Sequence, residues 1–362
     1  MTTKAVTYVR IEQTANCHCA TMRTGRPMVF FYRAIILVAA LCLAASRALA
    51  AECQGRDLFP ALKSEAPAAY AAIEAAASAM PFRHGKLFRL SRAGTEPSYV
   101  FATLHLSDPR ITAFSPRLRA ALAGSKIVAL ESIEMGAVLR QAIMTDRPAW
   151  RRATVARENQ KADRLLDKMD FAQLEALAAR KGVAQSAVHT FKPPVLALML
   201  DLPSCAAGSP GAKPYVDELV AGIARENKIE TVGLETIIEQ LEVLDGLPRE
   251  TARALLISIL RQAERGEDVI ETMVARYAEG DTGGLLAWLR AAEPIPGVAH
   301  AQIPPAFLDR LITVRTQRMR DRALPLLKRG GAFIAVGAAH LPGKEGLLSL
   351  FEKDGYKVET IE

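Results

Sequence analysis

Two histidines and two glutamates each end a short, mainly apolar run of the sequence. His105 and His340 end YVFATLH and FIAVGAAH, and Glu131 and Glu235 end KIVALE and ETVGLE. Two imidazoles with one or two carboxylates form a ligand set for a divalent transition metal, which would polarise a carbonyl group or lower the pKa of bound water toward about 7. A remaining glutamate would take the proton from that water. On the pattern alone, purely structural roles at strand ends are favoured over this chemistry.

The segments around these residues alternate between strand and helix patterns. Residues 87 to 106 predict two strands around a turn, and KIVALE predicts a short buried strand after a helix that Ser115 and Pro116 open. We expect helices over residues 213–227, 307–328 and about 344–353, each followed by a strand. Such alternation favours an α/β sheet with helices packed on it. In open α/β sheets, sites form at the carboxyl ends of strands, where the four side chains would meet.

The order strand, histidine, helix, strand occurs twice. YVFATLH leads through a helix to KIVALE, and AFIAVGAAH leads through a helix to YKVETIE. We interpret the core as internally duplicated strand–helix–strand units, in which the two histidines face each other across a cleft. Residues 141 to 214 are charged and helical in pattern, so they predict an inserted helical region. The Ala-rich stretch over residues 64–80 predicts one helix within an N-terminal segment, residues 51–84.

The N-terminus has the pattern of a secretory signal peptide. Arg33 precedes an apolar run, and Ala48-Leu49-Ala50 supplies an A-x-A cleavage site. The run is shorter than the about 20 residues that span a bilayer, so we expect no stable membrane anchor after cleavage. Residues 1–50 would be a signal peptide with an N-terminal extension, because a start at Met28 or Met22 gives a normal short basic region. We therefore expect a periplasmic or secreted protein.

Much of the basic charge belongs to this leader. The whole chain has a net charge of +7, and cleavage would remove six basic residues and one acidic residue, which leaves +2. The composition, 50% hydrophobic and 23% charged, is that of a globular chain. No basic cluster interleaved with aromatic residues remains, so nucleic acid is not expected as a partner.

Two of the five cysteines, Cys53 and Cys205, would remain after cleavage. One pair in an exported protein predicts a disulfide, which would join the N-terminal segment to the central helical region and contribute about 2–4 kcal/mol. Two free thiols are the alternative. A bridge requires Cα atoms within about 7 Å of each other.

Several common catalytic motifs are absent from the sequence. It holds no HExxH metalloprotease motif and no G-x-S-x-G nucleophile elbow, and its paired glycines lack the spacing of phosphate or dinucleotide loops. Nucleotide binding is therefore not indicated. The other histidines of the mature chain, His84, His189 and His300, are interpreted as bystanders.

Five segments in unbroken order carry a family resemblance. VGAAHLPGKEGLLSLFEKDGYKV has a G-x-x-H motif before a glycine-rich turn, a helix and a Gly-Tyr-x-Val strand. YVFATLHLSDPR, KIVALE, VGLETIIEQLEVLDGLP and VRTQRM precede it. Together, over residues 85 to 361, they resemble the TraB/PrgY/GumN (TraB/GumN) family, and its exported GumN-like subgroup most.

The resemblance implies kinship with the Tiki metalloproteases and with a fold group that includes erythromycin esterase and ChaN-like proteins. It implies hydrolysis at a divalent metal, Mn, Co or Zn, with His105, His340 and Glu131 as ligands. Glu131, Glu235 and Arg315 are the catalytic candidates. Arg315 matches the family arginine and would hold a substrate carboxylate or brace an acid. The implied substrate is a peptide or another component of the cell envelope.

Two residues depart from the family pattern. Ala102 stands where the first G-x-x-H motif has glycine, and Thr316 stands where the family usually has asparagine. Neither change removes a ligand, so a metal-dependent hydrolase is the main hypothesis. The departures favour the alternative, a non-catalytic periplasmic binding or accessory protein on the same fold, in polysaccharide biology. A metal-handling protein like the ChaN group is the third hypothesis.

Overall fold

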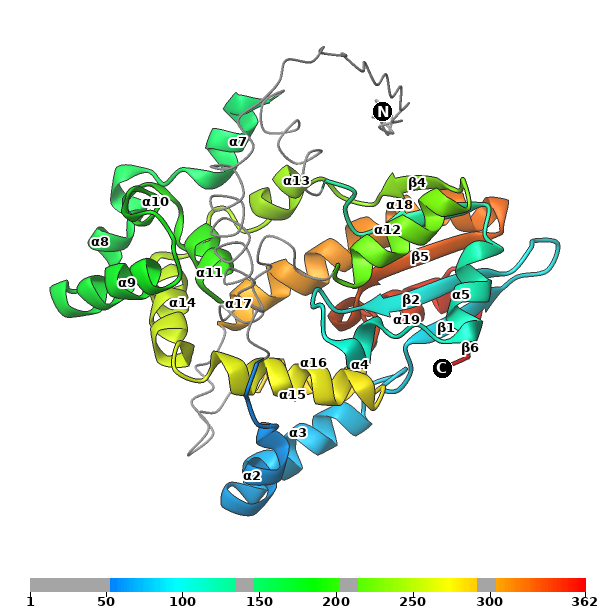
Figure 1. Cartoon of the computed structure of the whole chain (residues 1–362), viewed down its shortest axis with the longest axis horizontal. Coiled ribbons are helices and arrows are strands. Elements are labelled where there is room, and N and C mark those ends of the chain that lie inside the picture. Colours follow the sequence, from blue (N-terminus) through cyan, green and yellow to red (C-terminus); the bar gives the residue numbers. More distant parts are fainter. Residues whose placement is uncertain (1–52, 135–145, 202–213, 292–303) are drawn as a thin grey trace, which may run out of the picture. The chain divides into compact units, whose positions relative to one another are not determined.

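The computed structural model describes residues 53–134, 146–201, 214–291 and 304–362 (Figure 1). The predicted signal peptide and the candidate start at Met28 lie outside the described residues. Cys205 does too, so the Cys53–Cys205 disulfide stays a prediction. Within the described ranges, no helix combines the length and the apolar character needed to cross a bilayer.

A mixed sheet of six strands lies at the core, in the order β4-β3-β5-β2-β1-β6. β4, β3, β5 and β2 run parallel, and β1 is antiparallel to both β2 and β6. The central strand β5 is apolar and buried up to its last residue, as expected for a strand covered on both faces. The strands are β1 (Leu87–Ser91), β2 (Ser98–Thr103), β3 (Ile127–Leu130), β4 (Glu230–Gly233), β5 (Ala332–Gly337) and β6 (Lys357–Thr360).

Helices pack on both faces of the sheet (Figure 1). α5 (Pro116–Ala123) and α12 (Val216–Glu226) contact each other on one face, and α18 (Arg315–Arg329) and α19 (Leu347–Lys353) contact each other on the other. Ser115 caps α5 by accepting a hydrogen bond from the Leu118 N–H, as its sequence predicts. The predicted α/β class is therefore confirmed.

The remaining helices belong to the N-terminal segment and to the connections between strands. Helices α8 to α11 share a second apolar cluster with α14 and α17, so the central helical region has a core of its own. These helices are α2 (Leu58–Glu65), α3 (Pro67–Ser78), α4 (Pro109–Thr112), α7 (Arg147–Thr154), α8 (Ala162–Leu165), α9 (Lys168–Arg180), α10 (Gln185–Thr190), α11 (Pro193–Asp201), α13 (Ile237–Glu242), α14 (Arg249–Gln262), α15 (Gly266–Ala278), α16 (Thr282–Leu289) and α17 (Pro305–Leu308), with 3-10 turns at Glu158–Gln160 and Ala338–His340.

Three elements differ from the sequence predictions. The helix predicted over residues 64–80 is present as α3, but it begins at Pro67, because α2 ends at Glu65 and proline lacks the N–H that would continue that helix. β4 ends at Gly233, before Glu235. The helix predicted over 307–328 contains a π-helical stretch, Asp309–Val314.

The two strand–histidine–helix–strand units both join parallel strands, but they span different distances in the sheet. β2 connects to β3 across β5, whereas β5 connects to β6 across β2 and β1. The internal duplication therefore stays a prediction.

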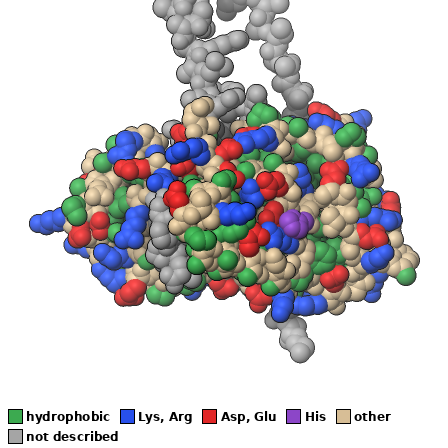
Figure 2. Space-filling view, turned by 90° about the horizontal axis from the view of Figure 1, so that it is seen from below, with side chains coloured by type: hydrophobic (Ala, Val, Ile, Leu, Met, Phe, Trp, Pro, Cys, Tyr) green, Lys and Arg blue, Asp and Glu red, His purple; other side chains and the backbone are tan. Residues whose placement is uncertain are grey.

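Charged side chains of both signs are interspersed on the face shown in Figure 2. Among the described residues, this face presents no continuous basic surface of the kind that binds a phosphate backbone. The expectation that nucleic acid is not a partner concerns the whole chain and stays a prediction.

The N-terminal helices are fixed against α16. Phe59, Leu62 and Ile73 pack with Leu285 and Trp288 in one apolar cluster. Such a cluster excludes water and holds α2 and α3 in one position relative to α16.

A buried ion pair adds to this attachment. Arg83 Nε and Nη2 donate to the two carboxylate oxygens of Asp281, each at 2.8 Å, and Nη2 also reaches Glu74 of α3 at 2.9 Å. Asp281 caps α16 as well, since its carboxylate accepts from the Gly284 N–H at 2.9 Å. Burial raises the pKa of Asp281, but the hydrogen bonds from Arg83 and Gly284, together with the Arg83 charge, outweigh it and the net pKa is lowered.

We expect Asp281→Ala to lower the free energy of unfolding by about 2–4 kcal/mol, because it removes a helix cap and leaves Arg83 without its main carboxylate. Asp281→Asn keeps a capping oxygen and should cost less. The charge contributes stability above about pH 3.9, the ordinary Asp pKa, and this is lost as pH falls through the lower folded-state pKa. Denaturant unfolding at several pH values measures both effects; equal stability of all three proteins would contradict the assignment.

Candidate functional site

The four residues selected from the sequence lie at one edge of the sheet. His105 follows β2, Glu131 follows β3, Glu235 follows β4 and His340 follows β5. Because these strands are parallel, their carboxyl ends meet at the same edge.

Gly337, at the end of β5, shows how closely three of these side chains converge. A Cβ atom at this position would lie 3.2 Å from Glu131 Oε2, 3.4 Å from His340 Cδ2 and 4.0 Å from His105 Nε2. His105 Nε2 is itself 3.9 Å from Glu131 Oε2. Steric crowding therefore explains why the Gly337–His340 motif begins with glycine. A side chain there would enter the space that both rings and the carboxylate surround.

His105 is oriented by a buried carboxylate. Its Nδ1 lies 2.7 Å from Asp217 Oδ2, and Asp217 is also held by the Thr103 hydroxyl, which donates to Oδ1 at 3.1 Å. A carboxylate accepts only, so Nδ1 carries the proton and Nε2 points to Glu131. Burial lowers the pKa of His105, but the Asp217 charge and hydrogen bond outweigh it and raise the pKa to about 9.

His340 is oriented by a hydroxyl. Thr316 Oγ1 donates its single proton to the Ile312 carbonyl at 2.8 Å, so it accepts the second bond, 2.8 Å long, from His340 Nδ1–H. Nε2 of His340 is then the nitrogen with a free lone pair. Burial, opposed by the charge of Glu131, lowers the pKa of His340 to about 4, which keeps this ring neutral.

The two rings differ in exposure from the expected pair facing a cleft. The His105 side chain is 54% exposed, but His340 is only 5% exposed. The expected cleft between the two rings therefore stays a prediction, because the 3-10 turn Ala338–His340 directs the second ring inward against Thr316.

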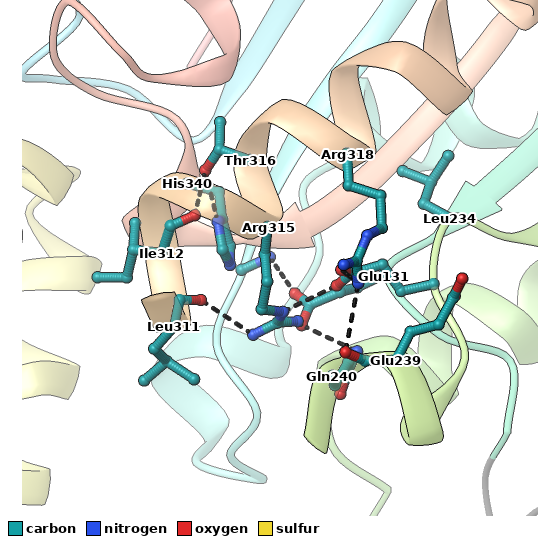
Figure 3. Close-up of polar contacts among 12 residues, drawn as sticks. Glu131, Leu234, Glu239, Gln240, Leu311, Ile312, Arg315, Thr316, Arg318 and His340 are labelled. Carbon is teal, nitrogen blue, oxygen red and sulfur yellow. Dashed lines mark hydrogen bonds and ion pairs between the residues drawn. The ribbon is translucent and has the colours of Figure 1, made fainter. Parts of the chain in front are cut away.

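Glu131 is a buried, ionised carboxylate. One oxygen accepts from Arg315 Nη2 and, at 3.4 Å, from Gln240, and the other accepts from the Gly337 N–H at 3.0 Å (Figure 3). Burial raises the pKa of Glu131, but Arg315 and the two histidines offset it and lower the pKa to about 2.

Arg315 joins this carboxylate to Glu235. Its Nε donates to Glu235 Oε2 at 2.8 Å and its Nη1 donates to the Leu311 carbonyl at 3.2 Å. Arg318 contacts the other Glu235 oxygen at 3.1 Å. Within the described part of the chain, Glu235 pairs with these two guanidinium groups and with neither histidine. Its burial, only partly offset by Arg315, raises its pKa.

The π-helical stretch Asp309–Val314 makes this arrangement possible. It leads into α18, and its Leu311 and Ile312 carbonyls accept side-chain bonds from Arg315 and Thr316, the Ile312 carbonyl in addition to the Arg315 N–H. The sequence pattern gave no sign of it.

The sequence reasoning also missed Asp217, Gln240 and the role of Thr316. Asp217 carried a weak signal, since it adjoins the apolar stripe of Val216, Val220 and Ala224 on the buried side of α12. An acid on the core-facing side of a helix needs a partner, and here the partner is His105.

A metal ion is consistent with the donor atoms, although they are not arranged as a finished coordination shell. No group of three or more His, Cys, Asp or Glu side chains across the described ranges has the arrangement of a metal site. Yet both rings have Nδ1 bonded to a protein acceptor, so Nε2 is the nitrogen left for a metal, directly on His340 and after loss of a proton on His105. His105, His340 and Glu131 therefore fit the chemistry of such a ligand set.

Comparison with known proteins gives the family. Residues 86–360 match the model of the TraB/PrgY/gumN family. The chain belongs to this family. The match begins just before β1 and ends at the last residue of β6. It therefore contains the whole sheet and the four strand-end residues of this TraB/PrgY/gumN chain.

Two curated metalloproteases are similar to part of the chain. Metalloprotease TIKI1 of Homo sapiens is 26% identical over 167 residues, and Metalloprotease TIKI2 of Xenopus tropicalis is 25% identical over 167 residues. The alignments cover 40% of this chain and about a third of each relative, 33% and 32%. No solved structure matches.

We expect Asp217→Asn to lower the pKa of His105 from about 9 toward 6.5, because the amide removes the charge that stabilises the imidazolium. A raised histidine pKa stabilises the fold below about pH 6.5, and this contribution is lost as pH rises through about 9. Nuclear magnetic resonance titration of the ring nitrogens in metal-free protein measures the shift. The control is Asp163→Asn on α8, which should leave His105 unchanged; equal titration curves for both variants would contradict the role of Asp217.

Proposed function

We propose that this TraB/PrgY/gumN protein is a metal-dependent hydrolase of peptide bonds in the cell envelope. The observation that carries the proposal is the convergence of His105 Nε2, the His340 ring and Glu131 Oε2 on the space beside Gly337. The partial similarity to two metalloproteases supports the reaction class. The predicted signal peptide supports the location.

His105, His340 and Glu131 would hold the metal, for which Mn, Co and Zn are the candidates. When bound, such an ion polarises a carbonyl group and makes water a nucleophile near neutral pH. The protein contributes two rings whose orientation is fixed at Nδ1 and a carboxylate that stays ionised across the physiological range.

Arg315 acts as a positioning residue in this proposal. Each of its three nitrogens already donates to a protein acceptor, namely Glu235, Leu311 and Glu131. It is also only 5% exposed. Bracing Glu131 therefore suits it better than holding a substrate carboxylate. Glu235 in turn neutralises and orients Arg315.

A non-catalytic accessory protein on the same fold is the second candidate. Arg315 and Gln240 occupy Glu131 in a way that also suits a purely structural role. The departures Ala102 and Thr316 favour this candidate too, although Thr316 does supply a hydrogen-bond partner for His340.

Metal content and peptidase activity of the purified protein test the proposal. We expect about one divalent ion per chain by plasma mass spectrometry, loss of peptide hydrolysis after chelation, and recovery with Mn, Co or Zn. His105→Ala should abolish both metal uptake and hydrolysis, and it should lower stability because the buried carboxylate of Asp217 loses its partner. His340→Ala should abolish them too, but also destabilise the fold because this ring is buried.

His189→Ala is the matched control. His189 is a half-exposed histidine on α10 that pairs with Glu175, so its loss should change neither metal content nor hydrolysis. A protein without metal and without hydrolysis after incubation with all three ions would overturn the hydrolase proposal and favour the accessory role. Stoichiometric metal without hydrolysis of any peptide would favour the metal-handling hypothesis.

A further inference from the structure

A cavity of about 400 Å³ adjoins the Thr316–His340 pair. It lies between the end of α3, the end of α16, the π-helical stretch and the loop after His340. Its size is within the range of small-ligand pockets. His340, a candidate metal ligand, is part of the lining, whereas His105 and Glu131 are not, so whatever occupies the cavity lies beside the His340 ring.

One wall of the cavity comes from outside the family match. Ala76, Ala79, Met80 and Pro81 line it, whereas the match to the TraB/PrgY/gumN model begins at residue 86. Ala76 of α3 and Ala79 just after it leave space in the cavity that larger side chains would fill. The N-terminal segment thus adds a surface of its own to a site that the family core builds.

The inner surface is apolar and the rim is positively charged. Leu286 and Ile312 are buried on the lining, and Arg290 and Lys344 are exposed on it. Arg290 donates a hydrogen bond to Thr313 at 3.4 Å. Among the described residues, neither cation forms an ion pair, and Glu345 is the one acidic residue of the lining. An apolar cavity with two available cations suits a ligand that combines an apolar body with an anionic group.

We propose that the cavity binds the C-terminal residue of a peptide substrate, with an apolar side chain inside and the terminal carboxylate paired with Arg290 and Lys344. This rests on the proposed hydrolase function, because it places the last peptide bond beside His340. Hydrolysis would add water across that bond: the carbonyl carbon gains the hydroxyl, the C–N bond breaks, and the nitrogen of the released amino acid takes the proton. The protein would then remove apolar C-terminal residues.

Calorimetric titration of the full-length protein tests this assignment. The probes are acetyl-Ala-Leu, its C-terminal amide, acetyl-Ala-Gly and octanoate. All titrations use the His105→Ala background, which removes turnover at a residue that does not line the cavity. We expect acetyl-Ala-Leu to bind about tenfold more tightly than its amide, because a charge-assisted contact is lost in the amide. Acetyl-Ala-Gly should also bind more weakly.

Matched variants locate the binding. Arg290→Ala and Lys344→Ala should remove the preference for the carboxylate over the amide, and exposed Arg117→Ala should retain it. Ala76→Leu should weaken all binding by filling the cavity, whereas Ala75→Leu, an exposed neighbour on α3 that does not line it, should not. Circular dichroism confirms folding of each variant.

The outcomes separate this proposal from the hydrolase proposal. Binding with the expected variant pattern supports the cavity assignment even if the wild-type protein hydrolyses nothing. No binding, equal effects of Ala76→Leu and Ala75→Leu, or tighter binding of octanoate than of acetyl-Ala-Leu would overturn it even if hydrolysis of other peptides is found.

Discussion

Two carboxylates buried after β3 and β4 require a cation between them, and Arg315 supplies it. Removing one member of a buried charge network costs about 3–5 kcal/mol, because the other members are left without a partner in a low dielectric. Burial alone raises the pKa of Glu131, and Arg315 makes the largest of the contributions that lower it and keep this carboxylate ionised. The position of Arg315 depends in turn on the π-helical stretch before α18. The same stretch lets the next residue, Thr316, orient His340.

The two histidines have different chemical states for physical reasons that the strand topology sets. β2 directs His105 toward α12, where the charge of Asp217 stabilises an imidazolium. β5 directs His340 into the interior, where a hydroxyl partner brings no charge and burial favours the neutral ring. A metal ion bound by Nε2 of both rings would have to displace the proton on His105 Nε2. Metal uptake would therefore be coupled to pH.

The sequence predicted the features that depend on local patterns. Apolar runs, the Ser115 cap and the turn glycines indicated the strands and helices, and the parallel order of an α/β sheet was enough to expect four side chains at one edge. Contacts between distant segments were beyond its reach. Nothing near His105 in the sequence indicates Asp217, and a π-helical turn differs from an α-helical one by a single displaced hydrogen bond per turn, which leaves no clear trace in residue types.

The cavity beside His340 combines residues of the family core with residues that lie outside the family match. The strands, the histidines and the glutamates all fall within the family match, whereas the alanines of α3 lie before it. The apolar cluster with Trp288 and the Arg83–Asp281 ion pair hold α3 rigidly against α16, so its wall has a defined distance from the Thr316–His340 pair. A larger residue at Ala76 would change the shape of the cavity without altering any bond to Glu131 or His105. In the proposed function, selectivity and chemistry would thereby be carried by separate parts of the chain.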